Sequence, residues 1–93
     1  MAKKVAVIVR DRQHEALRMA VGLTIGDNAV SVFIMDRKLP ADDLIDLNLQ
    51  ALGDMGARVF SNVPENVTGR GCELMTTGEI ARALVEFDTV IPY

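Results

Sequence analysis

Apolar runs that end in charged residues alternate along this chain with stretches whose apolar positions recur at helical spacing. Residues 5–9 form a continuous apolar run closed by Arg10-Asp11-Arg12, which is typical of a strand covered on both faces. Residues 13–25 predict a helix, whose apolar stripe consists of Ala16, Leu17, Ala20, Val21 and Thr24. We expect this helix to stop at Gly26-Asp27-Asn28, because these residue types tolerate a left-handed conformation.

A second strand and a second helix follow in the same order. Residues 29–35 are mainly apolar and lead into Asp36-Arg37-Lys38, and a helix is predicted over residues 42–54. The apolar stripe that we expect to face the core consists of Leu44, Leu47, Ala51, Leu52 and Met55. Gly53 and Gly56 mark the expected end of this helix.

The next part of the chain is less regular. Residues 57–60 predict a third strand. Pro64 and Gly71 then keep the chain irregular, or at most briefly helical, up to Cys72. A short fourth strand is expected around residues 73–75.

The last predicted helix begins with a capping box. In Thr76-Thr77-Gly78-Glu79, the Thr76 hydroxyl and the Glu79 carboxylate can each satisfy a free backbone N–H of the other residue. A helix over residues 77–86 and a closing strand over residues 87–91 are expected. Strands that alternate with helices imply right-handed parallel crossovers. The predicted fold class is therefore α/β, a three-layer sandwich with a mostly parallel sheet of four or five strands, in a single domain spanning residues 1–93.

Composition limits the classes of partner and the compartment. The net charge is -3 and the bases are mixed with acids, so we expect no basic face for nucleic acid. The apolar run after Lys3 and Lys4 is too short for a signal peptide or a membrane span, which predicts a cytoplasmic protein without a membrane partner. A single cysteine cannot form an internal disulfide, and a lone thiol suits a reducing compartment.

Charged and polar residues follow each of the first three predicted strands, where ligands bind in open parallel sheets. The candidate ligand-binding residues at these strand ends are Arg10, Asp11, Asp36, Arg37, Ser61 and Asn62. Acids beside bases could hold an anionic substrate or the carboxylate of a partner. The competing interpretation is that these charges only solvate the strand ends.

Cys72 is the one cysteine of the chain and follows Gly69-Arg70-Gly71. The charge of Arg70 favours the thiolate, the form that attacks or carries sulfur, so Cys72 is the candidate catalytic residue and Arg70 a further ligand-binding candidate. A free cysteine is more often a small buried hydrophobic residue, and this structural role is the weightier alternative. The Gly-Arg-Gly segment lacks the pattern of a phosphate-binding loop and indicates a turn.

His14 is the only histidine and is predicted in the first turn of the first helix, where the helix dipole favours the neutral imidazole. No second catalytic residue is visibly paired with it, so we expect a surface histidine. No group of His, Cys and acidic residues has the spacing of metal ligands, so we expect neither a metal nor another cofactor.

Four segments carry a resemblance to a known family: VAVIVRD, AVSVFIMD, ARVFSNVPENVTGRG and FDTVIPY. In this order they resemble the DsrE/DsrF/DsrH group of small sulfur-relay proteins over nearly the whole chain. The resemblance implies a small α/β sandwich, usually assembled into trimers, hexamers or complexes of related subunits. Catalytic members carry a persulfide-bearing cysteine just after the third strand, where this chain has Ser61-Asn62. The cysteine-free loop that leads to Arg70 and Gly71 is most similar to the DsrH-like branch.

Neither serine nor asparagine can carry a sulfane sulfur. We therefore expect an accessory, non-catalytic subunit of the sulfur-relay type. Such a subunit would bind a partner, which the resemblance implies is a sulfur-relay protein, or a small anion at the strand carboxyl ends. The alternative is a sulfurtransferase that uses Cys72 as an unconventional persulfide carrier, so the sequence leaves open whether the chain is an enzyme. A phosphoacceptor receiver domain fits the alternation of elements but lacks the paired acids after the first strand.

We also expect a homo-oligomer, a trimer or hexamer by the resemblance. A chain of this length hides only roughly 60–65% of the surface that its unfolded form exposes. Apolar residues that fall off the predicted core stripes are expected at the interface between subunits; they are Leu23, Ile25, Ile45 and Leu49.

Overall fold

The computed structural model describes residues 3–26, 28–67 and 70–93 of the chain. Within these residues, strands and helices alternate as the sequence pattern predicts. The strands are β1 (Lys3–Val9), β2 (Asn28–Ile34), β3 (Arg58–Ser61), β4 (Glu73–Leu74) and β5 (Thr89–Pro92). The helices are α1 (Gln13–Ile25), α2 (Asp43–Asp54), α3 (Thr77–Leu84) and a short 3-10 helix, η1 (Pro64–Asn66).

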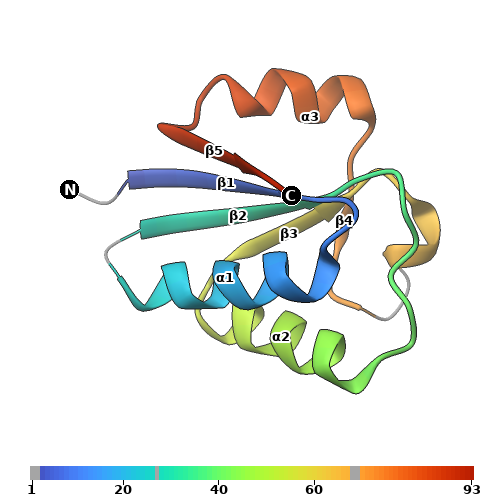
Figure 1. Ribbon diagram of the computed structural model, residues 1–93. Coiled ribbons are helices and arrows are strands. Elements are labelled where there is room, and N and C mark those ends of the chain that lie inside the picture. Colours follow the sequence, from blue (N-terminus) through green and yellow to red (C-terminus); the bar gives the residue numbers. More distant parts are fainter. Residues whose placement is uncertain (1–2, 27, 68–69) are drawn as a thin grey trace.

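The five strands form one sheet in the order β4-β3-β2-β1-β5, and every pairing in it is parallel. The register places Val7 of β1 between Val32 of β2 and Ile91 of β5. Helices α1 and α2 cover one face of this sheet, and α3 covers the other (Figure 1). The chain therefore has a Rossmann-like α/β fold in three layers, which confirms the predicted fold class with a sheet of five strands.

Side chains of β1 point alternately into two hydrophobic cores, one on each face of the sheet. Val5, Val7 and Val9 pack in the core that holds residues of α1 and α2, whereas Ala6 and Ile8 pack in the core that holds Ile80 of α3. All five side chains of the run are buried, because β1 lies inside a sheet with helices on both faces. The prediction of a strand covered on both faces is confirmed.

Three phenylalanines build the core under α3. The rings of Phe33 and Phe60 are stacked with centroids 5.2 Å apart, and Phe87 meets Phe33 edge-on at 5.7 Å. Phe87 packs in the core between the sheet and α3, and β5 starts at Thr89 and not at residue 87 as predicted. The preceding helix also ends early, at Leu84, where the Phe87 N–H donates to the Leu84 carbonyl at 3.2 Å and closes a turn.

The capping box predicted at the start of α3 is confirmed. The Glu79 N–H donates to Thr76 Oγ1 at 3.1 Å, and the Thr76 N–H donates to Glu79 Oε1 at 3.0 Å. The hydrogen bond from the Thr76 backbone N–H, together with the Thr76 side chain, lowers the pKa of the Glu79 carboxyl below its ordinary value. The first turn of α3 is thus stabilised by residues that are neighbours in the sequence.

The end of α1 differs from the prediction. Gly26 adopts an extended conformation with φ −81°, so it does not supply a left-handed stop, and Asp27 lies outside the described residues. Asn28 contributes instead, because its Nδ2 donates to the Leu23 carbonyl oxygen at 3.1 Å and satisfies a group that the helix end leaves free. Of the two glycines expected at the end of α2, Gly53 lies inside the helix, and Gly56, with a left-handed φ of +80°, follows its end.

The face of α2 that meets the sheet was predicted wrongly. The buried residues of α2 are Ile45, Leu49 and Leu52, whereas Leu44, Leu47 and Met55 are 62, 60 and 53% exposed. This helix carries two adjacent apolar stripes, and apolar spacing alone does not say which of them meets the sheet. Only Leu52 of the predicted stripe is fully buried.

Because α2 turns a different stripe toward the sheet than the sequence predicted, different residues are available at a subunit interface. Ile45 and Leu49, which we expected at an interface, lie in the hydrophobic core. Ile25 is 78% exposed, as the interface prediction requires, and Leu23 is half-buried. The exposed apolar surface of α2 is formed by Leu44, Leu47 and Met55, and the homo-oligomer itself stays a prediction.

Candidate functional site

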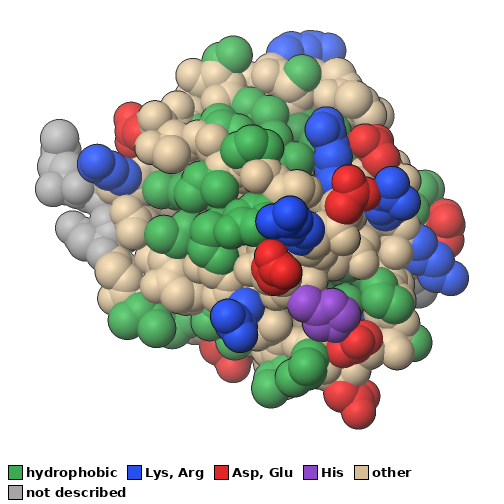
Figure 2. All heavy atoms as spheres, viewed as in Figure 1, with side chains coloured by type: hydrophobic (Ala, Val, Ile, Leu, Met, Phe, Trp, Pro, Cys, Tyr) green, Lys and Arg blue, Asp and Glu red, His purple; other side chains and the backbone are tan. Residues whose placement is uncertain are grey.

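The carboxyl ends of β1 and β2 bring four predicted site residues together. Arg37 Nε lies 2.6 Å from Asp11 Oδ1, and Arg10 Nε lies 3.6 Å from Asp36 Oδ2. Each of these four side chains is at least half exposed, so both ion pairs lie in solvent. Basic and acidic side chains alternate at the right of Figure 2, at the same end of the molecule as the strand ends in Figure 1. We call residues 10–12, 36–38 and 62 the strand-exit face.

Asn62 connects three elements of the strand-exit face. Its Oδ1 accepts the backbone N–H of Asp36 at 2.8 Å, and its Nδ2 donates to Asp36 Oδ1 at 3.0 Å. The same Nδ2 donates to Thr77 Oγ1 at 2.9 Å, at the start of α3. Asp36 has a left-handed backbone with φ 69°, which asparagine and aspartate tolerate better than most residues. The Asn62 amide therefore holds the loop after β2 in place.

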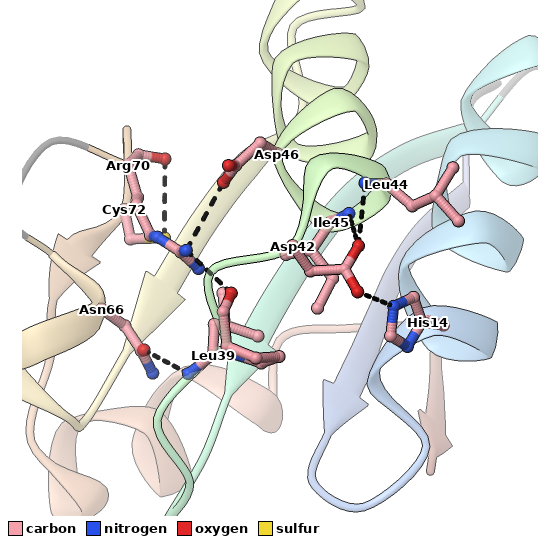
Figure 3. Close-up of polar contacts among 10 residues, drawn as sticks. His14, Leu39, Asp42, Leu44, Ile45, Asp46, Asn66, Arg70 and Cys72 are labelled. Carbon is pink, nitrogen blue, oxygen red and sulfur yellow. Dashed lines mark hydrogen bonds and ion pairs between the residues drawn. The ribbon is translucent and has the colours of Figure 1, made fainter.

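Ser61 is fully buried and belongs to the framework beneath this face. Its Oγ accepts the backbone N–H of Val63 and the Nδ2 of Asn66, each at 3.1 Å. Asn66 is also fully buried; its Nδ2 donates to the Arg37 carbonyl at 2.9 Å, and its Oδ1 accepts the Leu39 N–H at 2.7 Å (Figure 3). Sequence reasoning missed Asn66, since an asparagine near a proline ordinarily indicates an exposed turn.

Arg70 lies away from the strand-exit face. Its Nη2 donates to the Pro40 carbonyl at 2.8 Å and lies 3.6 Å from Asp46 Oδ1 (Figure 3). Its Nη1 is buried and has no hydrogen-bond partner in the described part of the chain. Arg70 also borders a hollow of about 510 Å³ beside α2, together with Gln50 and Val59. The hydrogen bond and the ion pair of the Arg70 side chain therefore do not involve the other predicted ligand-binding residues.

Cys72 is also outside the strand-exit face. It is 6% exposed and packs in the core shared with α1 and α2, and its Sγ lies 3.8 Å from the Arg70 carbonyl oxygen. Because Glu73 is beside Phe60 in the register, Cys72 is level with Val59, near the start of β3 and not at its end. Burial raises the pKa of the Cys72 thiol above its ordinary value of 9.0, and the charge of Arg70 opposes this shift only in part. The protonated, enclosed thiol is a poor nucleophile.

His14 has a partner that was not visible in the sequence. Its Nε2 lies 2.8 Å from Asp42 Oδ2, while Asp42 Oδ1 accepts the backbone N–H groups of Leu44 at 2.8 Å and Ile45 at 3.3 Å (Figure 3). The hydrogen bond from His14 is the main cause that lowers the pKa of the Asp42 carboxyl, with the two backbone bonds adding to it. The predicted surface position of His14 is confirmed, since half of its side chain is exposed.

Asp42 thus has two functions that the sequence did not reveal together. It is the N-cap residue of α2, and it orients the imidazole at the start of α1. A carboxylate that holds one imidazole nitrogen fixes the tautomer and leaves the other nitrogen available. The sequence pattern placed Asp42 at the start of the predicted helix without identifying it as the cap, and no sequence signal indicated a contact with another helix.

The described residues contain no group of three or more His, Cys, Asp or Glu side chains arranged to hold a metal ion. No helix among residues 3–26, 28–67 and 70–93 is long and apolar enough to cross a membrane. Comparisons with protein-family models, curated proteins and solved structures found no match.

Proposed function

We propose that the protein is an accessory, non-catalytic subunit of the sulfur-relay type that binds an anionic group at its strand-exit face. The group is a small anion or a carboxylate on a partner protein. One observation carries the proposal: Asn62, which stands at the expected carrier position, is held by hydrogen bonds to Asp36 and Thr77. The hydrogen bonds of this amide give it a structural function, because they hold the loop after β2 against the start of α3.

The local charge supports recognition of an anion. Residues 10–12 and 36–38 include four bases and two acids, a net of two positive charges, in a chain whose net charge is -3. All six side chains are exposed. Exposed ion pairs contribute roughly 0–1 kcal/mol each, so an incoming anion can replace Asp11 or Asp36 beside a guanidinium at little cost. Guanidinium groups also bind carboxylates and sulfur oxyanions through paired N–H donors.

The framework beneath the face supports the same function. Buried Ser61 and Asn66 join β3, η1 and the loop after β2 through hydrogen bonds of 2.7–3.1 Å. A loop that is ordered before binding loses less conformational entropy when a ligand arrives. The ordered loop therefore favours binding of an anion by the backbone and guanidinium groups of the strand-exit face.

The sulfurtransferase alternative has less support. The charge of Arg70 does favour the thiolate of Cys72, but burial has the larger effect on its pKa and acts in the opposite direction. A persulfide at Cys72 would also need space in a packed core. The accessory function therefore fits the described residues better.

The proposal is tested by mass measurement and by binding. After incubation with a persulfide donor, we expect the intact mass of the protein to show no added sulfur. In NMR titrations with thiosulfate and with a hexaglutamate peptide, we expect saturable amide shifts at residues 10–12 and 36–38 with at least one probe. Arg37→Glu should weaken that binding roughly ten-fold, while Arg82→Glu on α3 should leave it unchanged.

Two results would overturn the proposal. The first is a stoichiometric gain of sulfur that Cys72→Ala abolishes, which would establish the carrier function. The second is the absence of saturable shifts with both probes, because the face would then not recognise anions. The two probes separate a small anion from an acidic partner.

A further inference from the structure

A second groove lies between α1 and α2, and it has no part in the proposed function. Its volume is about 670 Å³, within the range of small-molecule sites. It is bordered by His14, Glu15, Arg18, Met19, Leu44, Asn48 and Tyr93. His14 and Arg18 are four residues apart on α1, and Leu44 and Asn48 are four apart on α2. Each pair thus lies on one face of its helix.

Apolar and aromatic surface forms part of the groove. Met19 and Tyr93 are half-buried, and the Tyr93 hydroxyl donates to Met19 Sδ at 3.3 Å. Leu44 lies opposite them on α2 and is 62% exposed. Exposure of a leucine in a concave site leaves apolar surface that a ligand can cover. This surface fits the flat apolar body of a small molecule.

Polar groups on α1 supply the complementary chemistry. His14 Nε2 is held by the Asp42 carboxylate, which leaves Nδ1 available. Arg18 forms no ion pair with any residue that the structure describes, and it is exposed. Glu15, which also lines the groove, has its Oε2 3.9 Å from Arg12 Nη1. Two carboxylates lie near these groups, Glu15 and Asp42, and each already has a partner. A guanidinium without an acidic partner among the described residues, beside an oriented imidazole, favours a ligand with a single negative charge.

We propose that this groove binds a small organic monoanion with an apolar body. The carboxylate of such a ligand lies between Arg18 and His14, and its body packs on Met19, Leu44 and Tyr93. The guanidinium supplies charge-assisted hydrogen bonds, and the imidazole adds a further polar contact. The proposal is independent of the strand-exit face, because the groove is formed by other residues.

The test uses 1-naphthoate as the probe and 1-naphthamide, its neutral analogue, as the matched ligand. In NMR titrations of the full chain, we expect saturable amide shifts at residues 14–19 and 44–48 with 1-naphthoate. The amide should bind roughly ten-fold more weakly, because it lacks the charge that Arg18 recognises. Arg18→Glu should weaken 1-naphthoate binding by at least the same factor, and Arg18→Lys should retain most of it.

Two control variants separate this site from the strand-exit face. Arg82→Glu should leave 1-naphthoate binding unchanged, and Arg37→Glu should leave the shifts of residues 14–19 and 44–48 unchanged. Loss of binding in Arg37→Glu with retention in Arg18→Glu would assign the anion to the strand-exit face and overturn the proposal. Equal binding of 1-naphthoate and 1-naphthamide, or no saturable shift at millimolar probe, would also overturn it. The absence of a saturable shift is also the result expected if a second copy of the chain covers the groove.

Discussion

His14 and Asp42 are 28 positions apart in the sequence, yet Nε2 of His14 lies 2.8 Å from Oδ2 of Asp42. The contact joins the first turn of α1 to the N-cap of α2. Since the same aspartate also accepts two backbone N–H groups of α2, one side chain links the orientation of two helices. The neighbouring groove depends on this link for the position of its imidazole.

Replacement of Asp42 should therefore destabilise the protein more than replacement of His14. Asp42→Ala removes the cap of α2 and the contact with α1, and we expect the melting temperature to fall by several degrees. His14→Ala removes only the contact between the helices and should have a smaller effect. Thermal melts followed by circular dichroism measure both variants. An equal loss in the two would show that capping contributes little.

Acid should weaken the fold partly through Asp42. Its pKa is lower in the folded chain than its ordinary value of 3.8, so its contribution to stability is fully present above that value. This contribution is lost as the pH falls from 3.8 through the lower pKa that Asp42 has in the folded chain. Urea unfolding between pH 5 and pH 2 should show a steeper loss in the wild type than in Asp42→Asn. Asp54→Asn, at an exposed acid of α2, serves as the matched control and should follow the wild type.

Asn66→Ala should cost about 2–3 kcal/mol of unfolding free energy. The substitution leaves the buried Leu39 N–H and the Arg37 carbonyl without their side-chain partner. The melting temperature should fall on the order of 10 °C. Asn48→Ala, at a half-buried asparagine of α2, should change the unfolding free energy by about 0.5 kcal/mol or less. A loss as small as that of the control would mean that water replaces the Asn66 amide.

Cys72 should react slowly with thiol reagents in the folded protein. Burial encloses the sulfur and raises its pKa, so little thiolate is present at pH 8. The chain has one cysteine, so the colour released from an aromatic disulfide reagent reports this thiol alone. The native rate should be far below the rate in denaturant, and similar rates would mean that Cys72 is open to solvent. Cys72→Ala should fold, at a cost of about 1–2 kcal/mol.

The predicted homo-oligomer is best tested at Leu47 of α2. Leu47 is 60% exposed and lies on the stripe that the sequence assigned to the core. We expect light scattering of the wild type to give the mass of an oligomer and Leu47→Asp to give that of a monomer with nearly unchanged melting temperature. Asp54→Asn controls for altered charge on the helix. A monomeric wild type would contradict the prediction and leave Leu47 as isolated exposed apolar surface.

The sequence by itself determined the elements and the class of the fold. The bounds of α1 agree with the prediction, and the Thr76–Glu79 capping box forms as expected. These features depend on residues within one or two turns of each other, so local spacing is sufficient to predict them. The apolar run of residues 5–9 likewise indicated a strand inside the sheet, because only a strand covered on both faces needs no polar side.

The tertiary structure alone decided which surfaces face one another. It placed Ile45 and Leu49 in the core and left Leu44 and Leu47 exposed, because the packing of α2 against the sheet selects one of two apolar stripes. It also buried Asn66. These positions depend on contacts between residues far apart in the chain, and the spacing of residues along one element carries no information about its neighbour. The His14–Asp42 pair exists for the same reason, since only the packing of α1 beside α2 brings the two side chains together.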